Sequence, residues 1–461
     1  MKISLFAAML CCSVAAAPAV FAQADRAELE DSLNFRAESM AYSIGVQAYI
    51  YGYPPVDYAQ YMKQQITPHD ERGGTYYAPL HQFYNLGKLS GPGEGFNGRS
   101  PNNDTVYFFS WLDLRASPIV IDVPAIPDNR YHVLTYADFY AETQQTGMRV
   151  TGNAAHTILV VGPDWRGLVP DGMHLVRMRT AQAFVLGRIL AIDDKDVRTV
   201  NKLIGQYRLR PLDPAARARA LELPDKEALE TLEFYRVLNR FLRDNPRLPG
   251  EEALMGLFDQ IGIGPNSDFD PDRISPATKR GLERAMIDGR RLVREGRRAD
   301  IRGWSSLRES LGSFGHDYLY RAAIDYSGLF GNESAESVYP RIRVDKSGAP
   351  LVGTKTYRIV LPKDQPPPAH GFWSLTAYDT RTFDLIPNAI NRYSVGDRTP
   401  GLRRRPDGAL EIRMQKTKPT DPHVNWLPVG DGPFSVTMRL YLPGVDVFNG
   451  SYKLPDIEEI Q

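Results

Sequence analysis

The chain has 461 residues, of which 43% are hydrophobic and 24% are charged, and its formal net charge is zero. This composition is typical of a globular protein, and the length suffices for two or three domains with large cores. A balanced charge does not support binding to nucleic acid, or to an anionic membrane surface, through bulk charge.

The N-terminal segment has the pattern of a secretory signal peptide. Lys2 supplies a positive charge, residues 3–14 form an apolar stretch, and residues 20–22 offer a cleavage site. The apolar stretch is short for a bilayer span, so we expect a periplasmic or secreted protein without an integral membrane span after cleavage. Both cysteines, Cys11 and Cys12, fall in this segment. The mature chain is therefore expected to have no disulfide, no thiolate nucleophile and no Cys-ligated metal.

Helical periodicity begins soon after this segment. Apolar residues recur at spacings of three and four, which predicts an amphipathic helix through Ala37, Ala41, Ile44, Ala48 and Tyr51. Pro54 and Pro55 should end this helix, because a proline disfavours the helical conformation at the residue before it. A second short helix is expected over residues 56–62.

β-Strands are predicted on both sides of a helical middle. Runs rich in β-branched and aromatic residues, separated by turn signals, occur at 106–114, 119–123, 131–136 and 157–161. Similar runs follow at 351–361, 372–378, 410–416 and 434–442. Helices are predicted between the two sets at 226–243 and 278–298, and a further helix, capped by residues 193–196, should turn Val197, Val200, Leu203 and Ile204 inward. Short strands with frequent turns favour antiparallel sheets, so the predicted fold class is α+β and β-rich.

Motifs for metals and cofactors are missing from the sequence. The eight histidines form no His-x-His or His-Glu-x-x-His spacing. Asn102, Asn103 and Asp104 offer oxygen ligands for a hard cation such as Ca²⁺, but the spacing of a calcium loop does not accompany them. A nucleophile elbow, a phosphate-binding loop and a dinucleotide fingerprint are also missing. We expect no metal and no cofactor, and the spacing does not indicate a structural Ca²⁺.

The clearest functional segment is residues 99–114, where a loop with two Asn and one Asp leads into an aromatic strand. Loops held by a rigid scaffold often present polar groups to a ligand. Because strand side chains alternate with period two, Tyr107 and Trp111 should share a face. Tyr136 and Tyr140 should likewise share a face with Asp138.

Aromatic, Arg and Asn side chains recur near these strand ends and suit a polar-aromatic cleft. Rings bind sugar faces, Arg binds carboxylates through its planar fork, and Tyr or His transfers protons. The candidate catalytic residues are Asn103, Tyr136, Tyr140 and Arg149. The candidate substrate-binding residues are Tyr107, Trp111, Arg130, His132, Arg188, Trp373 and Trp426. The alternative interpretation is that these side chains pack a β core and satisfy one another's polar groups.

Short motifs occur in a characteristic order along the chain. The first half contains Asn102-Asn-Asp-Thr-Val-Tyr107, Gly162-Pro-Asp-Trp165 and Leu186-Gly-Arg188. The second half contains Phe372-Trp-Ser-Leu-Thr-Ala-Tyr-Asp379, Asn425-Trp-Leu-Pro428 and Arg439-Leu-Tyr441. The chain resembles bacterial proteins that pair the domain of unknown function 1254 with the domain of unknown function 1214.

This resemblance implies an exported protein with a β-rich first domain, helices and a jelly-roll-like second domain, and it implies no settled activity. The expected divisions are a signal peptide at 1–22, a β-rich domain at 36–190, a helical connecting region at 191–335 and a β-sandwich at 336–455.

Three functions fit this inventory, each with a small-molecule or polysaccharide ligand. The first is a polyuronate lyase, in which Asn103 and Arg149 neutralise the uronate carboxylate and Tyr136 or Tyr140 moves the proton in a β-elimination. The second is non-catalytic binding of a carbohydrate or aromatic ligand. The third is amide or ester hydrolysis, which lacks a nucleophile motif and would use the Asp104 and Asp138 carboxyl groups as an acid–base pair. The sequence does not indicate an oligomeric state.

Overall fold

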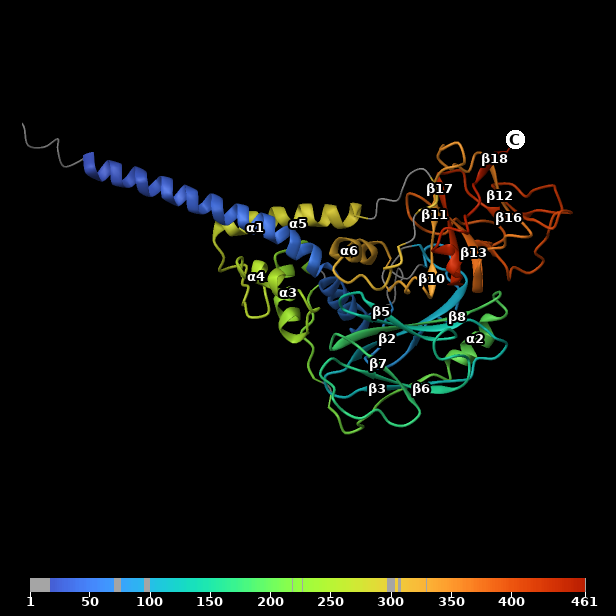
Figure 1. The fold of residues 1–461 in the computed structure, drawn as a ribbon, viewed down its shortest axis with the longest axis horizontal. Coiled ribbons are helices and arrows are strands. Elements are labelled where there is room, and N and C mark those ends of the chain that lie inside the picture. Colours follow the sequence, from blue (N-terminus) through green and yellow to red (C-terminus); the bar gives the residue numbers. More distant parts are fainter. Residues whose placement is uncertain are drawn as a thin grey trace, which may run out of the picture.

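The computed structural model describes residues 17–69, 76–94, 100–217, 219–225, 227–296, 303–305, 308–328 and 330–460. Most of the predicted signal peptide, with Cys11 and Cys12, lies outside these residues. Two β-rich domains and a layer of helices make up the described part (Figure 1). The fold is mixed α+β with mostly antiparallel sheets, which confirms the predicted fold class.

The first domain consists of two facing sheets. One sheet has the order β1 (Tyr84–Asn85), β2 (Thr105–Asp113), β8 (Gln182–Leu190), β4 (His132–Asp138) and β5 (Thr143–Gly147). The other has the order β7 (Met173–Arg177), β6 (His156–Val161), β3 (Ile119–Val123) and β9 (Arg208–Pro211). Alternate residues of β2 and β8, such as Phe108 and Val185, fill the space between the sheets. Helix α2 (Val197–Ile204) buries its apolar face against this core.

The second domain is also a pair of facing sheets. One has the order β10 (Ser337–Val338), β17 (Phe434–Pro443), β13 (Ala369–Asp379) and β14 (Ser394–Gly396), and β11 (Arg341–Ile342) also pairs with β17. The other has the order β16 (Asn425–Pro428), β15 (Leu410–Gln415), β12 (Thr356–Leu361) and β18 (Glu458–Ile460). Their facing apolar side chains form one core. The short 3-10 helix η3 (Val445–Val447) follows β17.

Helices cover the outer face of the β1-β2-β8-β4-β5 sheet. They are α1 (Ala17–Ile66), α3 (Glu233–Asp244), α4 (Glu252–Asp259), α5 (Pro276–Glu295), α6 (Tyr318–Ser327) and the short η2 (Ala228–Glu230). Tyr58 and Tyr61 of α1 pack on Trp111 of that sheet, and Phe241 of α3 stacks on Phe139, which follows β4. Helix α1 runs beside α5 and extends beyond it (Figure 1). No helix among the described residues is long and apolar enough to cross a membrane.

The prediction that Pro54 and Pro55 end the first helix is wrong, because α1 continues through both to Ile66. A proline within a helix lacks the N–H that would bond to the carbonyl four residues earlier. For Pro55 that carbonyl belongs to Tyr51, and Arg321 of α6 donates to it at 2.9 Å. A side chain distant in sequence thus takes the place of the missing helical donor.

Candidate functional site

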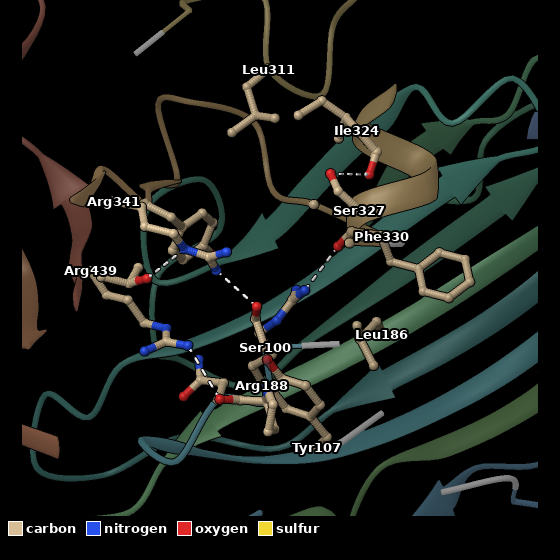
Figure 2. A pocket seen from close by; sticks show the side chains of 16 residues that line it. Ser100, Tyr107, Leu186, Arg188, Leu311, Ile324, Ser327, Phe330, Arg341 and Arg439 are labelled. Carbon is tan, nitrogen blue, oxygen red and sulfur yellow. Dashed lines mark hydrogen bonds between the residues drawn. The ribbon is translucent and has the colours of Figure 1, made fainter. Parts of the chain in front are cut away.

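Three arginines from two domains meet at one cavity. Arg188 lies on β8, Arg341 on β11 and Arg439 on β17, and Figure 2 shows all three beside the loop at Ser100. The cavity has a volume of about 160 Å³. It is lined by Ser100, Pro101, Asn102, Tyr107, Leu186, Arg188, Leu311, Ile324, Ser327, Gly328, Phe330, Gly331, Tyr339, Arg341, Thr437 and Arg439.

Strand alternation places these arginines on the cavity side. Gly187, next to Arg188, faces the inner core, where the Phe108 ring leaves no room for a side chain. Arg188 therefore points to the opposite face of the sheet, as Tyr107 does on the paired strand β2. Thr437 and Arg439 are two residues apart on β17 and share a face in the same way.

Arg188 is 4% exposed, and each of its hydrogen-bond acceptors is neutral. Its guanidinium donates to Thr135 Oγ1 at 2.8 Å, to Asn332 Oδ1 at 2.7 Å and to the Phe330 carbonyl at 2.9 Å. Its Nε is buried and donates to no acceptor in the described part of the chain. The positive charge of Arg188 is therefore held by dipoles, without a carboxylate within ion-pair distance among the described residues.

Arg439 is likewise buried and donates only to neutral acceptors. It is 4% exposed and donates to Thr376 Oγ1 at 2.6 Å, to the Pro101 carbonyl at 3.3 Å and to the Tyr378 hydroxyl. None of these acceptors is a carboxylate.

Arg341 adds a third guanidinium at the cavity, where it donates to Ser100 Oγ at 2.8 Å and to Thr437 Oγ1 at 3.0 Å. Burying a charge is costly unless it is compensated. Convergent guanidinium groups therefore make the cavity a region of positive potential.

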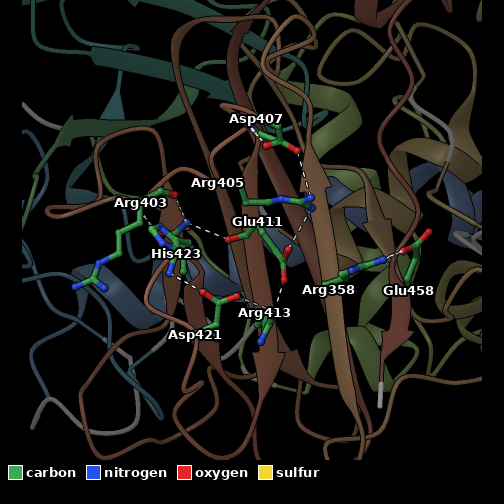
Figure 3. A network of polar contacts seen from close by, with 11 residues as sticks. Arg358, Arg403, Arg405, Asp407, Glu411, Arg413, Asp421, His423 and Glu458 are labelled. Carbon is green, nitrogen blue, oxygen red and sulfur yellow. Dashed lines mark hydrogen bonds and ion pairs between the residues drawn. The ribbon is translucent and has the colours of Figure 1, made fainter.

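A group of arginines elsewhere in the second domain is paired with carboxylates. On the outer sheet, Arg405 and Arg413 both donate to the buried carboxylate of Glu411, at 3.4 and 2.7 Å (Figure 3). Arg413 also reaches Asp421 at 3.3 Å, and Arg358 pairs with Glu458 at 3.0 Å. Arg188 and Arg439 at the cavity differ from this network, because none of their hydrogen-bond acceptors among the described residues is a carboxylate.

Three buried phenol groups at or beside the cavity are neutral at physiological pH. Burial raises the pKa of Tyr339, and it likewise raises the pKa of Tyr378 and Tyr441 on the adjoining strands. These hydroxyls therefore add hydrogen-bonding capacity and no negative charge. The charged groups that line the cavity are its guanidinium groups, and the Asp104 carboxylate acts on Arg439 electrostatically from outside the lining.

Backbone strain also marks this cavity. Ser100 and Phe330 both line it with positive φ angles, of 43° and 61°. A bulky residue such as Phe rarely adopts the left-handed conformation, and such strain gathers at ligand sites. At Phe330 this conformation accompanies a carbonyl directed at Arg188.

The four residues predicted to be catalytic do not share a cavity. Asn103 donates to the Ser90 carbonyl at 2.7 Å, and Arg149 pairs with Glu336 at 2.8 Å. Tyr136 is buried between the two sheets, where its hydroxyl lies 3.0 Å from Thr146 Oγ1. Tyr140 is buried in the helical core on the other side. The expected common face of Tyr136 and Tyr140 is wrong, because β4 ends at Asp138 and the chain turns there.

Two of the predicted binding residues, Tyr107 and Arg188, line the cavity together, with the guanidinium 5.2 Å from the ring centre. Trp111 shares the face of Tyr107, as predicted, but its indole packs in the helical core and donates to Gln65 Oε1 at 2.8 Å. Trp373 lies in the core of the second domain. Trp426 donates to the Gln415 carbonyl at 2.8 Å.

The remaining predicted binding residues, Arg130 and His132, do not line the cavity. Arg130 donates to Asp196 and to the Leu190 carbonyl, at 2.5 and 2.7 Å. His132 Nε2 lies 3.2 Å from the Gly152 carbonyl. Burial lowers the pKa of His132 to about 4, so this imidazole is neutral near pH 7.

The carboxyl groups proposed for hydrolysis are far apart. The Asp104 carbonyl accepts from the N–H of Ala191, just beyond one end of β8, whereas Asp138 pairs with Ala183 near the other end. These positions are eight residues apart along the chain, which corresponds to about 25 Å in an extended strand. The Asp104–Asp138 version of the hydrolase hypothesis is therefore wrong.

Sequence reasoning missed Arg341 and Arg439 as site residues. Arg439 had a usable signal, because it stands at the centre of the otherwise apolar strand segment Met438-Arg-Leu-Tyr441, and a charge in such a position needs a reason. No comparable signal marked Arg341 in the sequence, because its position depends on a strand of only two residues. No group of three or more His, Cys, Asp or Glu side chains in the described ranges could hold a metal ion.

Comparison with known proteins supports the sequence resemblance. Residues 80–211 match the family described as protein of unknown function (DUF1254), and residues 336–445 match protein of unknown function (DUF1214). No curated protein matches the chain.

Solved structures of similar fold include the VPA0106 protein from Vibrio parahaemolyticus. It is 24% identical, with a TM-score of 0.69 over 91% of this chain and 100% of that chain. A putative uncharacterized protein from Burkholderia cenocepacia is 12% identical, with a TM-score of 0.45 over 94% of this chain and 96% of its own. The two matched regions follow one another in the expected order, and the chain therefore belongs to the proteins that carry a DUF1254 region followed by a DUF1214 region.

Proposed function

We propose that this protein binds a small anionic molecule in the cavity between its two β domains. The observation that carries the proposal is the pair Arg188 and Arg439, both buried at the cavity and both held by neutral acceptors. Planar guanidinium groups bind carboxylates and phosphates through paired hydrogen bonds. An anion in the cavity would supply the charge that their present partners lack.

The location favours binding over a structural role. Ligand sites concentrate at domain interfaces, in concave pockets with a few convergent polar groups. Here the first domain contributes Tyr107 and Arg188, and the second contributes Arg341 and Arg439. A ligand that touches both domains would also stabilise their association.

Isothermal titration calorimetry of the full-length chain tests the proposal. Acetate, benzoate, glucuronate and inorganic phosphate serve as anions, and glucose serves as an uncharged comparison. We expect at least one anion to bind, and Arg341→Gln to weaken it about ten-fold or more, because a lost charge-assisted hydrogen bond is worth at least ~1.4 kcal/mol.

Arg343→Gln is the matched control, because Arg343 is exposed two residues away and does not line the cavity. Binding of none of the anions at millimolar concentration would overturn the proposal. An equal loss in the two variants would overturn it as well.

A polyuronate lyase is the second candidate, favoured by the adjacent Tyr107 and Arg188. In a β-elimination, Arg188 would neutralise the uronate carboxylate, and Tyr107 as its phenolate would take the proton from the carbon next to that carboxylate. A carbon–carbon double bond would form as the bond from the next carbon to the glycosidic oxygen breaks, and the Tyr107 hydroxyl would return the proton to the departing oxygen. Incubation with a panel of uronate polymers, followed through the ultraviolet absorbance of the unsaturated product, tests this reaction. Activity that is lost in Tyr107→Phe is the expected result, and silence across the panel contradicts it.

We also propose that the protein is exported to the periplasm or secreted. Three features of the N-terminal segment support this location. They are the positive charge at Lys2, the apolar stretch at 3–14 and the small residues near position 22. Mass spectrometry of the protein from fractionated cells should find a mature N-terminus close to residue 23. Recovery of the uncleaved chain from the cytoplasm alone would contradict export.

A further inference from the structure

We infer that the ligand of this cavity is a carboxylate joined to a compact apolar body, about the size of one six-membered ring. The inference rests on the proposed anion binding and names its chemical class. It follows from the division of the cavity wall into a charged side and an apolar side.

The apolar side is built from both the sheet and the helical layer. Leu186 of β8, Ile324 of α6 and Phe330 are nearly or fully buried, and Leu311 is half-buried beside them. In Figure 2 Leu311, Ile324 and Phe330 lie on the side away from Arg439. A free inorganic anion would contact the arginines and leave this wall without a partner.

The wall is also firmly placed. The Phe330 ring stacks on Phe184 at a centroid separation of 3.9 Å and meets Tyr58 at 4.9 Å. The Phe330 carbonyl accepts from Arg188, so the same residue joins the apolar side to the charged side. A rigid apolar surface next to a guanidinium suits a ligand whose charge and apolar body are directly connected.

Size sets the upper limit of the ligand. The cavity measures about 160 Å³, and apolar cavities near ~150 Å³ accommodate a benzene molecule. A ring that carries one carboxylate fills such a space, whereas a long acyl chain would have to extend out of it.

Calorimetric titration of the full-length chain with a matched series of probes tests this inference. The series is benzoate, cyclohexanecarboxylate, acetate, benzyl alcohol and inorganic phosphate. Benzoate and cyclohexanecarboxylate should each bind about ten-fold or more tightly than acetate, because burial of the ring removes apolar surface from water. They should exceed benzyl alcohol by a similar factor, because the alcohol lacks the charge.

A variant of the apolar wall distinguishes the contribution of the apolar side to binding from that of the charged side. Leu311→Ala should weaken benzoate several-fold and leave the affinity for acetate unchanged, whereas Arg341→Gln should weaken both. Leu257→Ala is the control, because Leu257 is an exposed leucine of α4 outside the cavity.

The outcomes distinguish this inference from the proposed function. Phosphate or acetate binding as tightly as benzoate would overturn the inference and leave anion binding in place. Benzyl alcohol binding as tightly as benzoate would overturn both, because charge would then play no part. Absence of binding by the whole series would also overturn both.

Discussion

The carboxylate of Asp104 accepts a hydrogen bond of 2.6 Å from the hydroxyl of Ser374, and this contact joins the first domain to the second. Asp104 also accepts from Ser394 at 3.2 Å, and the neighbouring Asn102 donates to the Tyr441 hydroxyl at 2.5 Å. The polar loop before β2 therefore connects the domains while its residues 100–102 line the cavity.

Removal of this contact should destabilise the protein. Asp104→Ala deletes two hydrogen bonds to a charged acceptor and leaves Ser374 unsatisfied in a buried position. Hydrogen bonds to charged groups are worth about 1.5–3 kcal/mol each, so we expect a loss of about 3 kcal/mol in the free energy of unfolding. Urea denaturation measures it, with the exposed Asp164→Ala as control. A loss no greater than that of the control would show that the contact does not hold the domains.

Arg321 and Pro55 should be energetically coupled, because Arg321 donates to the carbonyl that Pro55 leaves without a helical partner. Pro55→Ala restores that donor. The cost of Arg321→Met should therefore be about 1 kcal/mol smaller in the Pro55→Ala background than in the natural chain. Pro54→Ala is the control, because the carbonyl four residues before it is that of Ile50. Equal coupling with both prolines would argue against the interpretation.

Substitution by alanine at two glycines within helices should change the stability of the protein in opposite directions. At Gly281 of α5, a Cβ would lie 2.4 Å from the Glu38 carbonyl oxygen of α1, so Gly281→Ala should cost about 1–3 kcal/mol through overpacking. At Gly256 of α4, no atom lies within 4 Å of the added Cβ. Gly256→Ala should stabilise by about 0.5–1 kcal/mol because alanine favours a helix. Thermal or chemical unfolding of both variants measures whether the free energy of unfolding falls or rises in each.

His132 should make the protein sensitive to acid. Burial lowers its folded-state pKa to about 4 from an unfolded value of 6.5. Between these values the unfolded chain binds more protons, so the free energy of unfolding should fall as the pH drops from 6.5 to 4. The loss due to this residue reaches about 3 kcal/mol at pH 4.

Denaturation curves at several pH values measure this slope. His132→Gln should flatten it, because the glutamine does not titrate, whereas the same change at the exposed His370 should leave it intact. An unchanged slope in His132→Gln would exclude this imidazole as the source of the acid sensitivity.

Local patterns predicted much of the secondary structure. The strand expected at 119–123 is β3, and the helix expected to bury Val197, Val200, Leu203 and Ile204 is α2, in which these four residues are buried. Of the face expected for the first helix, Ala41, Ile44, Ala48 and Tyr51 are buried, whereas Ala37 is only partly buried. These features follow from backbone preferences and apolar spacing, which act over a few residues.

The continuation of α1 through Pro54 and Pro55 could not be predicted in this way. Proline does remove a helical hydrogen bond, but the Tyr51 carbonyl accepts instead from the guanidinium of Arg321, 270 residues away. The same limit applies to Tyr136 and Tyr140. Strand alternation predicted that they share one face, but the chain turns after Asp138, and the two side chains lie in different cores.

The sequence by itself determined the α+β class, the order of the two matched regions and the polar character of the loop before β2. It included Tyr107 and Arg188 among seven candidate binding residues, on the basis of side chains near strand ends and of the family-like motifs. Only the tertiary structure decided that Arg188 meets Arg341 and Arg439, which lie more than 150 residues later. The physical reason is that a binding cavity depends on which strand faces meet across a domain interface, and no local preference of the chain encodes that pairing.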